Sequence, residues 1–409
     1  MKTKIVMSLF AVVVAFVALA SYVPTASAHG ERSQEPFLRM RSLQWYDTKW
    51  STDSLAVNGE FILTGKFHVF EDWPSVLEPP EVAFMNIAVP SPVLTREGSW
   101  INGVNMVNST KLQIGGDYEY KIVMRGRHPG RWHLHPMVNV LRAGPIVGPG
   151  NWVTVTGSND DFTNPEVTLT GEEIDLEYYG VANVVRWHII WAIPAVFWLL
   201  WWLRRPLFIP RRKMVEDGNA EDQLVTPLDR KIGVVLLVGT LLLTLWGHLD
   251  ANKKNPITIP LQTGLATTPP LVLPDAVDAK VVRATYRIPG RAMKMTLEIT
   301  NKGSTPLKLG EFESATVRFI NKGVGEVDPK YPDYLMAENG LQVEPSGPIF
   351  PGETKTVKVV AADAAWETER LSSLIHDPDS RFGGQLFFYD PAGNRFIERI
   401  GAPLIPAFR

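Results

Sequence analysis

Two histidines separated by one residue are the strongest candidates for chemistry in this sequence. They are His133 and His135, in the stretch RWHLHPM. On a β-strand both side chains point to the same face and lie about 6.6–6.8 Å apart along the chain. Two imidazoles in that relation can reach one metal ion from opposite sides. Half-buried strands also carry two polar residues at this spacing without any metal, so the pair by itself does not define a site.

A third histidine follows a signal-peptidase cleavage pattern. A basic start and an apolar run occupy residues 1–20, and the small-residue triplet ASA at 26–28 directly precedes His29. This order is typical of a secretory signal peptide. We predict a signal peptide over residues 1–28 and a mature chain that begins on His29; an uncleaved anchor helix is the alternative. A free N-terminal histidine offers its α-amino nitrogen and its imidazole to the same ion.

The predicted ligands are rich in nitrogen. His29, His133 and His135 supply up to four nitrogen donors, and the 409-residue sequence contains no cysteine. Nitrogen-rich, tetragonal coordination suits Cu(II), which also leads the divalent affinity order. Zinc accepts three histidines and a water and is the rival metal. The chelating amine, which gives up its proton readily to a competing metal, favours copper. We therefore predict one copper ion at these three residues.

His68 is a candidate ligand for an additional copper. It lies in the stretch GKFHVF, which we expect to form a neighbouring strand. A single histidine does not define a site. The sequence shows no Ser/His/Asp arrangement, phosphate-binding loop or paired acid/base motif that would indicate another kind of chemistry.

The composition excludes several classes of site. A formal net charge of −2 gives no reason to expect a nucleic-acid partner. The lack of cysteine excludes a disulfide framework, an iron–sulfur cluster, thiolate zinc and a cysteine-ligated blue-copper centre. It also fits an oxidising compartment, where a stray thiol is a liability.

Two apolar segments predict membrane-spanning helices. Residues 184–203 and 232–249 each approach the ~20 residues that a bilayer requires. The loop between them, 204–231, carries seven lysines and arginines, and positively charged loops stay in the cytoplasm. We therefore predict that the two long flanking regions, 29–180 and 251–409, both face the periplasm.

The sequence patterns of both flanking regions predict β-structure. Short strands such as KMTLEITNKG and ETKTVKVV alternate with turn residues and have no helical pattern between them, which favours antiparallel β-sandwiches. The stretch YEYKIVMRGRHPGRWHLHPMVNV predicts a hairpin with its turn at 126–130. The predicted fold class is mainly β, with two sandwiches joined by the two helices. The second region contains one histidine, so we expect it to bind no copper of its own and to serve as a scaffold.

These motifs together resemble one known family. The stretches HGERSQEPFLRMRSLQWYDTKWS, GKFHVF, PGRWHLHPMVNV and GPIVGPGNWVTVTG, with a signal peptide and two spans, are similar to the B subunits of the copper membrane monooxygenases. That family includes particulate methane monooxygenase and ammonia monooxygenase. The similarity runs along the whole chain.

The resemblance implies a fold, partners and a reaction. It implies two cupredoxin-like periplasmic domains joined by two transmembrane helices in the lipid of a plasma or intracytoplasmic membrane. It implies A and C subunits as partners in a trimer of heterotrimers. The implied reaction is the oxidation of methane to methanol with O2 and a reductant such as a quinol. Ammonia oxidation, a membrane-anchored periplasmic copper carrier and a polysaccharide monooxygenase are the alternatives.

The resemblance also assigns copper ligands. The family's copper site in this subunit maps to His29, His133 and His135. Some members hold a further copper between two histidines, of which the second corresponds to His68 and the first to Gln44. An amide at that position predicts no robust second site at His68.

Overall fold

The computed structural model describes most of the chain after the predicted signal peptide. The described residues are 32, 34–90, 92–168, 170–203, 205, 208–219, 221–256, 264–287, 291–377 and 379–408. His29 and the predicted signal peptide lie outside them. The chain forms two compact units: one contains the β regions before residue 163 and after residue 263, and the other contains the residues between.

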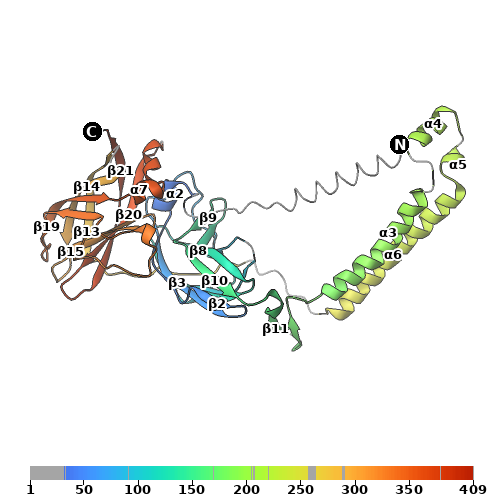
Figure 1. The fold of residues 1–409 in the computed structure, drawn as a ribbon, viewed down its shortest axis with the longest axis horizontal. Helices are drawn as coiled ribbons and strands as arrows, with labels where there is room; N and C mark the ends of the chain where they lie inside the picture. The colour runs from blue at the N-terminus through green and yellow to red at the C-terminus, as the bar shows by residue number, and fades with distance from the viewer. Residues whose placement is uncertain are drawn as a thin grey trace. The chain divides into compact units, whose positions relative to one another are not determined.

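The first β region is a sandwich of two sheets, called here the first sandwich (Figure 1). One sheet has the order β1-β3-β7-β5-β6, with bounds Leu43–Trp50, Glu60–Val69, Asp117–Gly126, Leu94–Ile101 and Val104–Asn105. The other has the order β2-β10-β8-β4, with bounds Ser54–Ala56, Asn151–Thr156, Gly130–Val140 and Ala83–Ala88. The short strand β9 (Gly144–Val147) pairs with β8.

The predicted hairpin at 126–130 is wrong. Strand β7 pairs with β3 and β5, whereas β8 pairs with β4, β9 and β10. The connection at 127–129 therefore crosses from one sheet to the other. A turn signal between two strands marks a change of direction, but the partner of each strand is chosen by its neighbours in space.

Side-chain alternation builds the core of the first sandwich. Along β7, Tyr118, Tyr120 and Ile122 are buried, while Glu119 and Lys121 are exposed. Successive side chains on a strand point to opposite faces, so one face of each sheet packs inward. The inward residues of β8 meet them in the same hydrophobic cluster.

The second β region, called here the second sandwich, follows a single path of nine strands. The order is β17-β16-β15-β20-β21-β13-β14-β19-β18, with bounds Met336–Ala337, Val317–Ile320, Lys308–Ser314, Arg381–Tyr389, Arg395–Ala407, Val277–Arg287, Ala292–Asn301, Thr354–Ala362 and Leu341–Glu344. Residues 395–403 of β21 pair with β20, and 404–407 pair with β13. Because β21 pairs with a strand of each layer, it connects the two layers of the sandwich. Both layers contribute side chains to one hydrophobic core.

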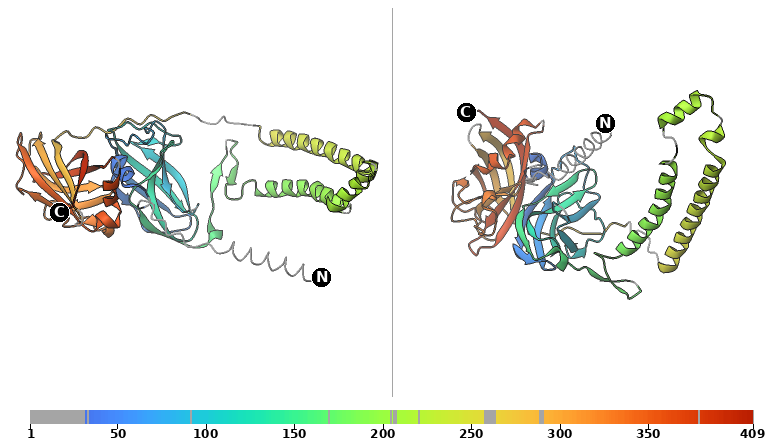
Figure 2. Two further views of the ribbon diagram at one scale, coloured as in Figure 1. Left: turned by 90° about the horizontal axis from the view of Figure 1, so that it is seen from above. Right: turned by 45° about the vertical axis from the view of Figure 1, so that its right-hand side comes forward.

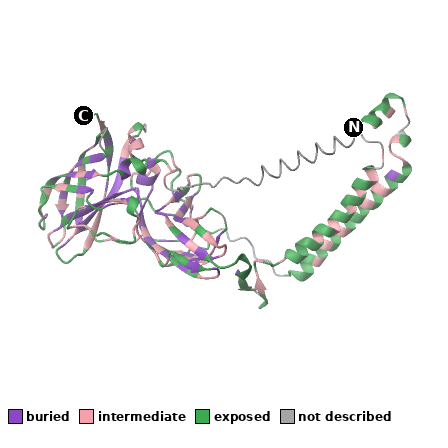
Figure 3. Cartoon of the chain, viewed as in Figure 1, coloured by how far each residue is buried: buried purple, intermediate pink, exposed green. Residues whose placement is uncertain are grey.

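The second unit is a helical hairpin that follows a small β-hairpin. Helix α3 (Val181–Leu203) and α6 (Pro227–Lys254) lie side by side, with α4 (Phe208–Glu216) and α5 (Glu221–Leu224) between them and β11 (Pro165–Val167) and β12 (Glu173–Asp175) before them (Figure 2). Among the described residues, two helices are long and apolar enough to cross a membrane, α3 and α6. Their surfaces are largely exposed, unlike the strands (Figure 3). The mainly-β fold class with two β domains and two such helices is confirmed.

Hydrogen bonds to Asp229 in the first turn of α6 connect the two long helices. Asp229 in the first turn of α6 accepts hydrogen bonds from the backbone N–H and hydroxyl of Thr226, each 2.8 Å. It also accepts from Trp201 Nε1 and Arg205 on the α3 side, each 2.8 Å. Thr226 in turn accepts from the Asp229 backbone, which completes a capping box. The buried carboxylate thus fixes where one helix ends relative to the start of the other.

Charged side chains join the two sandwiches. Asp117 on β7 accepts a hydrogen bond from Tyr46 Oη at 3.0 Å and pairs with Arg399 on β21. Asp47 pairs with Arg395 on the same strand of the second sandwich. Helix α2 (Pro36–Arg41) contacts both β1 and β20 at this junction (Figure 1). The two sandwiches therefore meet through buried and half-buried charges as well as apolar contact.

Replacing Asp117 by Asn tests this junction. The change leaves Arg399 and His68 without their shared carboxylate in a site where Asp117 is only 6% exposed. We expect the free energy of unfolding to fall by about 3 kcal/mol, because a buried charge that loses its partner keeps its desolvation penalty. Urea unfolding of the detergent-solubilised chain, followed by tryptophan fluorescence, measures the change.

The control is Glu81→Gln, which breaks an exposed ion pair. Glu81 and Lys111 lie 2.6 Å apart and each side chain is 60% exposed. Exposed pairs contribute less than about 1 kcal/mol, so this variant should unfold almost as the parent does. Equal losses for the two variants would contradict a stabilising role for burial at Asp117.

Candidate metal centre

Strand β8 presents the two histidines on the face opposite the core. Leu134 between them is fully buried in the first sandwich, and His133 and His135 point the other way. His135 is buried at 3% exposure, whereas His133 is half-buried. The alternation predicted from the spacing is thus present, and His135 is more deeply buried than His133.

The two imidazoles lie against each other. Their ring centroids are 4.5 Å apart and the ring planes are nearly perpendicular, at 84°. His135 Nε2 lies 3.2 Å from His133 Nδ1. Two nitrogens bound to one ion at ~2.0–2.1 Å are separated by about 2.8 Å at a right angle and about 4 Å when opposite. The observed separation is nearer to that of neighbouring ligands than to the opposed arrangement expected from the strand.

A backbone contact fixes the tautomer of His135. Its Nδ1 lies 3.0 Å from the carbonyl oxygen of Gly148. A carbonyl oxygen only accepts, so Nδ1 carries the hydrogen and Nε2 carries the lone pair. That lone pair faces His133. Orientation of a metal-binding imidazole by a carbonyl on its other nitrogen is the usual arrangement in metal sites.

The histidine pair packs against Gly150 and Trp152. A Cβ at Gly150 would lie 2.4 Å from His135 Cε1 and 2.9 Å from His133 Cε1, so only glycine leaves room for both rings. Trp152 on β10 stands opposite His133 in the register, with ring centroids 4.8 Å apart. Trp152 is 44% exposed, so the pair is reached from the surface of the sandwich.

The described residues place no third candidate ligand beside the pair. Within the described part of the chain, no group of three or more His, Asp or Glu side chains is placed to hold a metal ion. His29 lies outside the described residues. Gln34, five residues later, is bound to β9: its Nε2 donates to the Pro145 carbonyl, and its Oε1 accepts from Val147 N at 3.2 Å. This contact places Gln34 beside the strand that precedes the Gly148 carbonyl.

His68 occupies a different environment, in the other sheet. It stands opposite Gln44 in the β1–β3 register and is 1% exposed. Its Nε2 lies 3.2 Å from Glu71 and its Nδ1 lies 3.3 Å from Asp117. Gln44 turns its amide to the Met40 carbonyl, 2.8 Å away. The structure does not bring His68 together with His133 and His135.

The surroundings of His68 favour its charged form. Burial lowers the pKa of this imidazole, but the carboxylates of Asp117 and Glu71 outweigh burial and hold the pKa above its ordinary value. Burial likewise opposes ionisation of Asp117, yet His68 and Arg399 hold its pKa below the ordinary range. A protonated imidazole has no lone pair for a metal, so this arrangement suits an ion-paired histidine.

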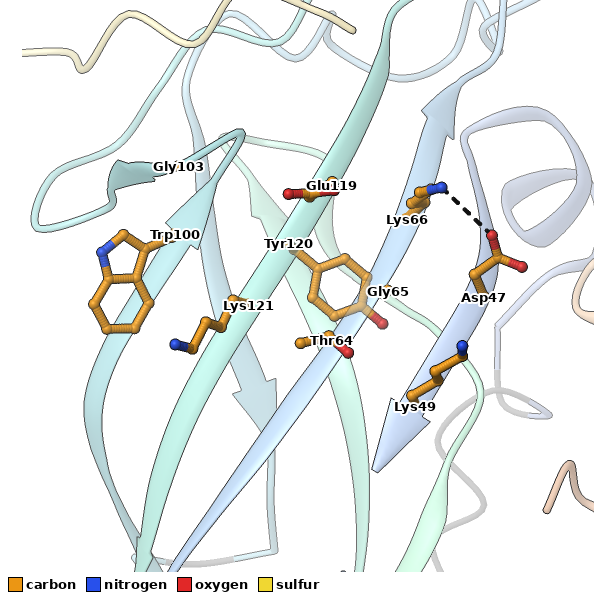
Figure 4. Close-up of a pocket in the computed structure, with 10 residues that line it drawn as sticks. All are labelled: Asp47, Lys49, Thr64, Gly65, Lys66, Trp100, Gly103, Glu119, Tyr120 and Lys121. Atoms are coloured by element: carbon orange, nitrogen blue, oxygen red, sulfur yellow. Dashed lines mark ion pairs between the residues drawn. The ribbon is translucent and has the colours of Figure 1, made fainter. Parts of the chain in front are cut away.

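A groove on the first sandwich contains none of the histidines. It has a volume of about 480 Å³ and lies over β1, β3, β7 and β5, where Lys66 and Asp47 form an ion pair of 3.7 Å (Figure 4). Trp100 and Lys121 flank its other side, 5.3 Å apart in a cation–π contact. No histidine lines the groove, so it offers no cluster of imidazole ligands.

Several parts of this centre could not be identified from the sequence. The carbonyl of Gly148, the space at Gly150 and the ring of Trp152 all come from the stretch GPGNW. Two glycines around a proline signal a tight connection, but they do not say which side chain the connection approaches. No feature of the sequence around Gln34 predicts that its side chain binds β9.

Comparison with known proteins gives two consistent results. A family model that describes the B-subunit proteins of monooxygenases matches residues 30–408. A relative from Methylococcus capsulatus, named "Particulate methane monooxygenase alpha subunit", is 50% identical over 396 residues, covering 96% of this chain and 95% of the relative. The family description uses the subunit letter expected from the sequence, whereas the name of the relative uses alpha.

One solved structure is also similar in part. It is the cupredoxin domain of amoB from Nitrosocaldus yellowstonii, at 17% identity and a TM-score of 0.25. The similarity covers 30% of this chain and 91% of that structure.

Replacing Gly150 by Ala tests whether the space beside the rings is required. The new Cβ would collide with both imidazoles, and the buried ring of His135 is held in place by Gly148. We expect Cu(II) binding by the full-length protein to weaken at least ~10-fold, as for loss of a group that orients a metal ligand. Competition with a chelator, read by EPR, measures the change.

Gly264→Ala is the matched control, since a Cβ there meets nothing within 4 Å. It should bind Cu(II) as the parent does. If Gly150→Ala binds equally well, the two rings do not hold the ion in the described arrangement.

Proposed function

We propose, from the premise that this chain belongs to the monooxygenase B-subunit family, that it is the copper-binding subunit of a membrane monooxygenase that oxidises methane to methanol. The observation that carries the proposal is the pair formed by His133 and His135, with the Nε2 lone pair of His135 turned toward His133. In this contact His133 Nδ1 donates its hydrogen to His135 Nε2, and a copper ion bound by the pair would take the place of that hydrogen.

The third and fourth donors in this proposal come from the mature N-terminus. Cleavage after residue 28 would give His29 a free amine, and Gln34, five residues later, is bound to β9. The residues present thus fit copper: His133, His135 and His29 would hold it. Bound there, copper supplies one-electron redox chemistry, and the Gly148 carbonyl keeps the His135 proton on Nδ1 so that Nε2 stays available.

The reaction and the partners follow from the relative. Its name states methane monooxygenase and a subunit, which supports methane as the substrate and a complex of several chains. In the proposed reaction one oxygen atom of O2 enters methanol and the other leaves as water, with two electrons from a reductant such as a quinol and two protons. We extend the proposal to A and C subunits as partners in a trimer of heterotrimers in a plasma or intracytoplasmic membrane.

The same proposal places both sandwiches in the periplasm. Helices α3 and α6 would span the membrane, and the basic segment 204–231 would lie in the cytoplasm. A signal peptide over 1–28 fits this orientation. Domain bounds of 29–180 and 251–409 then describe the two periplasmic parts, the first with copper and the second as a scaffold.

Histidine variants in the purified complex test the copper site. His135→Ala removes one nitrogen donor, so we expect the nitrogen-rich Cu(II) EPR signal to be lost and one copper per chain to disappear. His68→Ala should retain that signal, because His68 is ion-paired with Asp117 and Glu71. Loss of the copper from His68→Ala with retention in His135→Ala would overturn the assignment. Methane oxidation by the same samples tests the reaction separately.

Labelling of single cysteines tests the topology. The chain has no cysteine of its own, so each introduced thiol is read without background. In intact spheroplasts, Ser304→Cys on the exposed surface of the second sandwich should react with a membrane-impermeant maleimide. Asp217→Cys after α4 should react only after the membrane is permeabilised. The reverse pattern would contradict the proposed orientation.

A further inference from the structure

A pocket where the two sandwiches meet contains a buried carboxyl group that the proposed copper site does not use. The pocket has a volume of about 250 Å³ and is lined by β1 of the first sandwich and by β15, β16, β20 and β21 of the second. Glu313 on β15 lines it and is only 5% exposed. Buried polar groups normally have hydrogen-bond partners, so one without a partner points to an occupant that is not part of the chain.

The other glutamate on this strand, Glu311, has its partners within the chain. Its Oε2 accepts from Arg318 Nε and Nη2 at 3.1 and 2.7 Å. Its Oε1 accepts from the backbone N–H of Glu326 at 3.1 Å and from the Tyr389 hydroxyl. Arg318 also donates to the Glu326 carbonyl at 2.9 Å. The guanidinium nearest to the two glutamates on β15 is therefore engaged by Glu311 and by backbone.

Glu313, by contrast, makes no hydrogen bond and no ion pair with any of the residues that the structure describes. Arg318 stands opposite it in the β15–β16 register but is engaged by Glu311. Gln385 stands opposite it on β20, is 1% exposed, and has no described partner for its amide oxygen or its amide nitrogen. Opposite residues of an antiparallel pair have neighbouring side chains, so two buried and unpartnered polar groups lie side by side.

The pocket has two more carboxyl groups than cations. The five carboxyl groups are those of Asp47, Glu311, Glu313, Glu326 and Asp328, and the three cations are Lys49, Arg318 and Arg395. Arg318 pairs with Glu311, and Arg395 pairs with Asp47. The other three carboxyl groups form no ion pair with a described residue. The charge of the pocket therefore suits a ligand with two positive charges.

Burial is the main reason that the pKa of Glu313 is raised to about 8. Arg318 and Arg395 act to lower this pKa, whereas Glu311 and Asp47 act to raise it. The further charged or titratable groups on the elements around it are Lys49, Glu326, Asp328, Tyr331, Tyr389 and Arg399. Glu313 is therefore mostly neutral at pH 7, and it gains its charge when a cation takes the place of its proton.

We propose that this pocket binds a short aliphatic diamine in its doubly protonated form, with one ammonium group on Glu313 and the other on Glu326 and Asp328. An ammonium group has three hydrogens to donate and no lone pair. It therefore matches the carboxyl of Glu313 and the amide oxygen of Gln385, neither of which has a donor within the described chain. Two ammonium groups also balance the two carboxyl groups that the pocket has in excess.

Two observations favour an organic cation over a metal ion. Within the described part of the chain, no group of three or more His, Asp or Glu side chains is placed to hold a metal. Phe387 and Tyr331 also line the pocket, and their rings can cover an aliphatic chain but give a hard metal ion no oxygen ligand beyond the tyrosine hydroxyl. None of these residues belongs to the candidate metal centre, so the proposal is independent of copper.

Titration calorimetry with putrescine, a four-carbon diamine, tests the site in the full-length detergent-solubilised protein. Measurements at pH 7 in two buffers with different protonation enthalpies give the number of protons released on binding. We expect one putrescine per chain and about one proton released, because the ammonium group displaces the Glu313 proton. The affinity should rise roughly tenfold from pH 6 to pH 7 and level off above about pH 8, where Glu313 is already ionised.

Glu313→Gln keeps the shape of the side chain and removes the titrating group. We expect it to weaken putrescine binding about 10- to 100-fold, the equivalent of one charge-assisted hydrogen bond, and to abolish the proton release. Glu298→Gln is the matched control, because it removes the same charge from an exposed position on β14, outside the pocket. This control should bind putrescine and release a proton as the parent does.

Three results would overturn the proposal. The first is no saturable binding of millimolar putrescine to the parent protein, which would mean that the pocket holds water only. The second is binding without proton release, which would place the ammonium group away from Glu313; this result needs no variant, so it stands even where Glu313→Gln does not fold. The third is equal weakening by Glu313→Gln and Glu298→Gln, which would show attraction by the net charge of the protein and no defined site.

Discussion

Strand β8 packs against the hydrophobic core with one face and carries His133 and His135 on the other. The rest of the candidate centre depends on this division between the two faces. Leu134 and Val138 fill the core from one face, which fixes the rotation of the strand. His133 and His135 must therefore both lie on the other face. A register slip of one residue would bury both imidazoles in the core and expose Leu134. The apolar packing of the sandwich is therefore what aims the imidazoles.

The strands and the connection beside β8 determine how the two imidazole rings are oriented. Strand β9 and the Gly148–Gly150 connection return along β8, and they bring a carbonyl to one nitrogen of His135 and an open space to both rings. Strand β10 adds the ring of Trp152. These elements are short, but they pair with β8 and place Ile146 and Val153 in the same hydrophobic cluster as Leu134. Pairing and core packing together hold the surroundings of the two imidazoles.

Buried carboxylates are paired in the same way at two places in the compact β unit. At the junction of the sandwiches, Asp117 holds Tyr46 and Arg399, and His68 lies beside it. Near α7 (Ala365–Thr368), Glu369 holds two arginines of the N-terminal segment. In both places a carboxylate is removed from water and surrounded by donors, because an unpaired buried carboxylate would be costly. Removing one partner from such a pair is costly, because the other charge then stays buried without compensation.

The sequence by itself determined the mainly-β class, the two apolar helices and the shared face of His133 and His135, because each of these follows from periodicity, length or spacing within one segment. It also identified the family through motifs that run along the whole chain. Tertiary structure alone decided that β7 and β8 belong to different sheets, that Gly150 leaves space for two rings, and that Gln34 and Arg32 attach to separate sandwiches. His68 shows the same limit: its place on an expected neighbouring strand marked a candidate ligand, while its two carboxylate neighbours come from β7 and from the loop after β3. Pairing between distant segments is set by which surfaces can bury each other together, and that choice is not encoded in any single stretch of the chain.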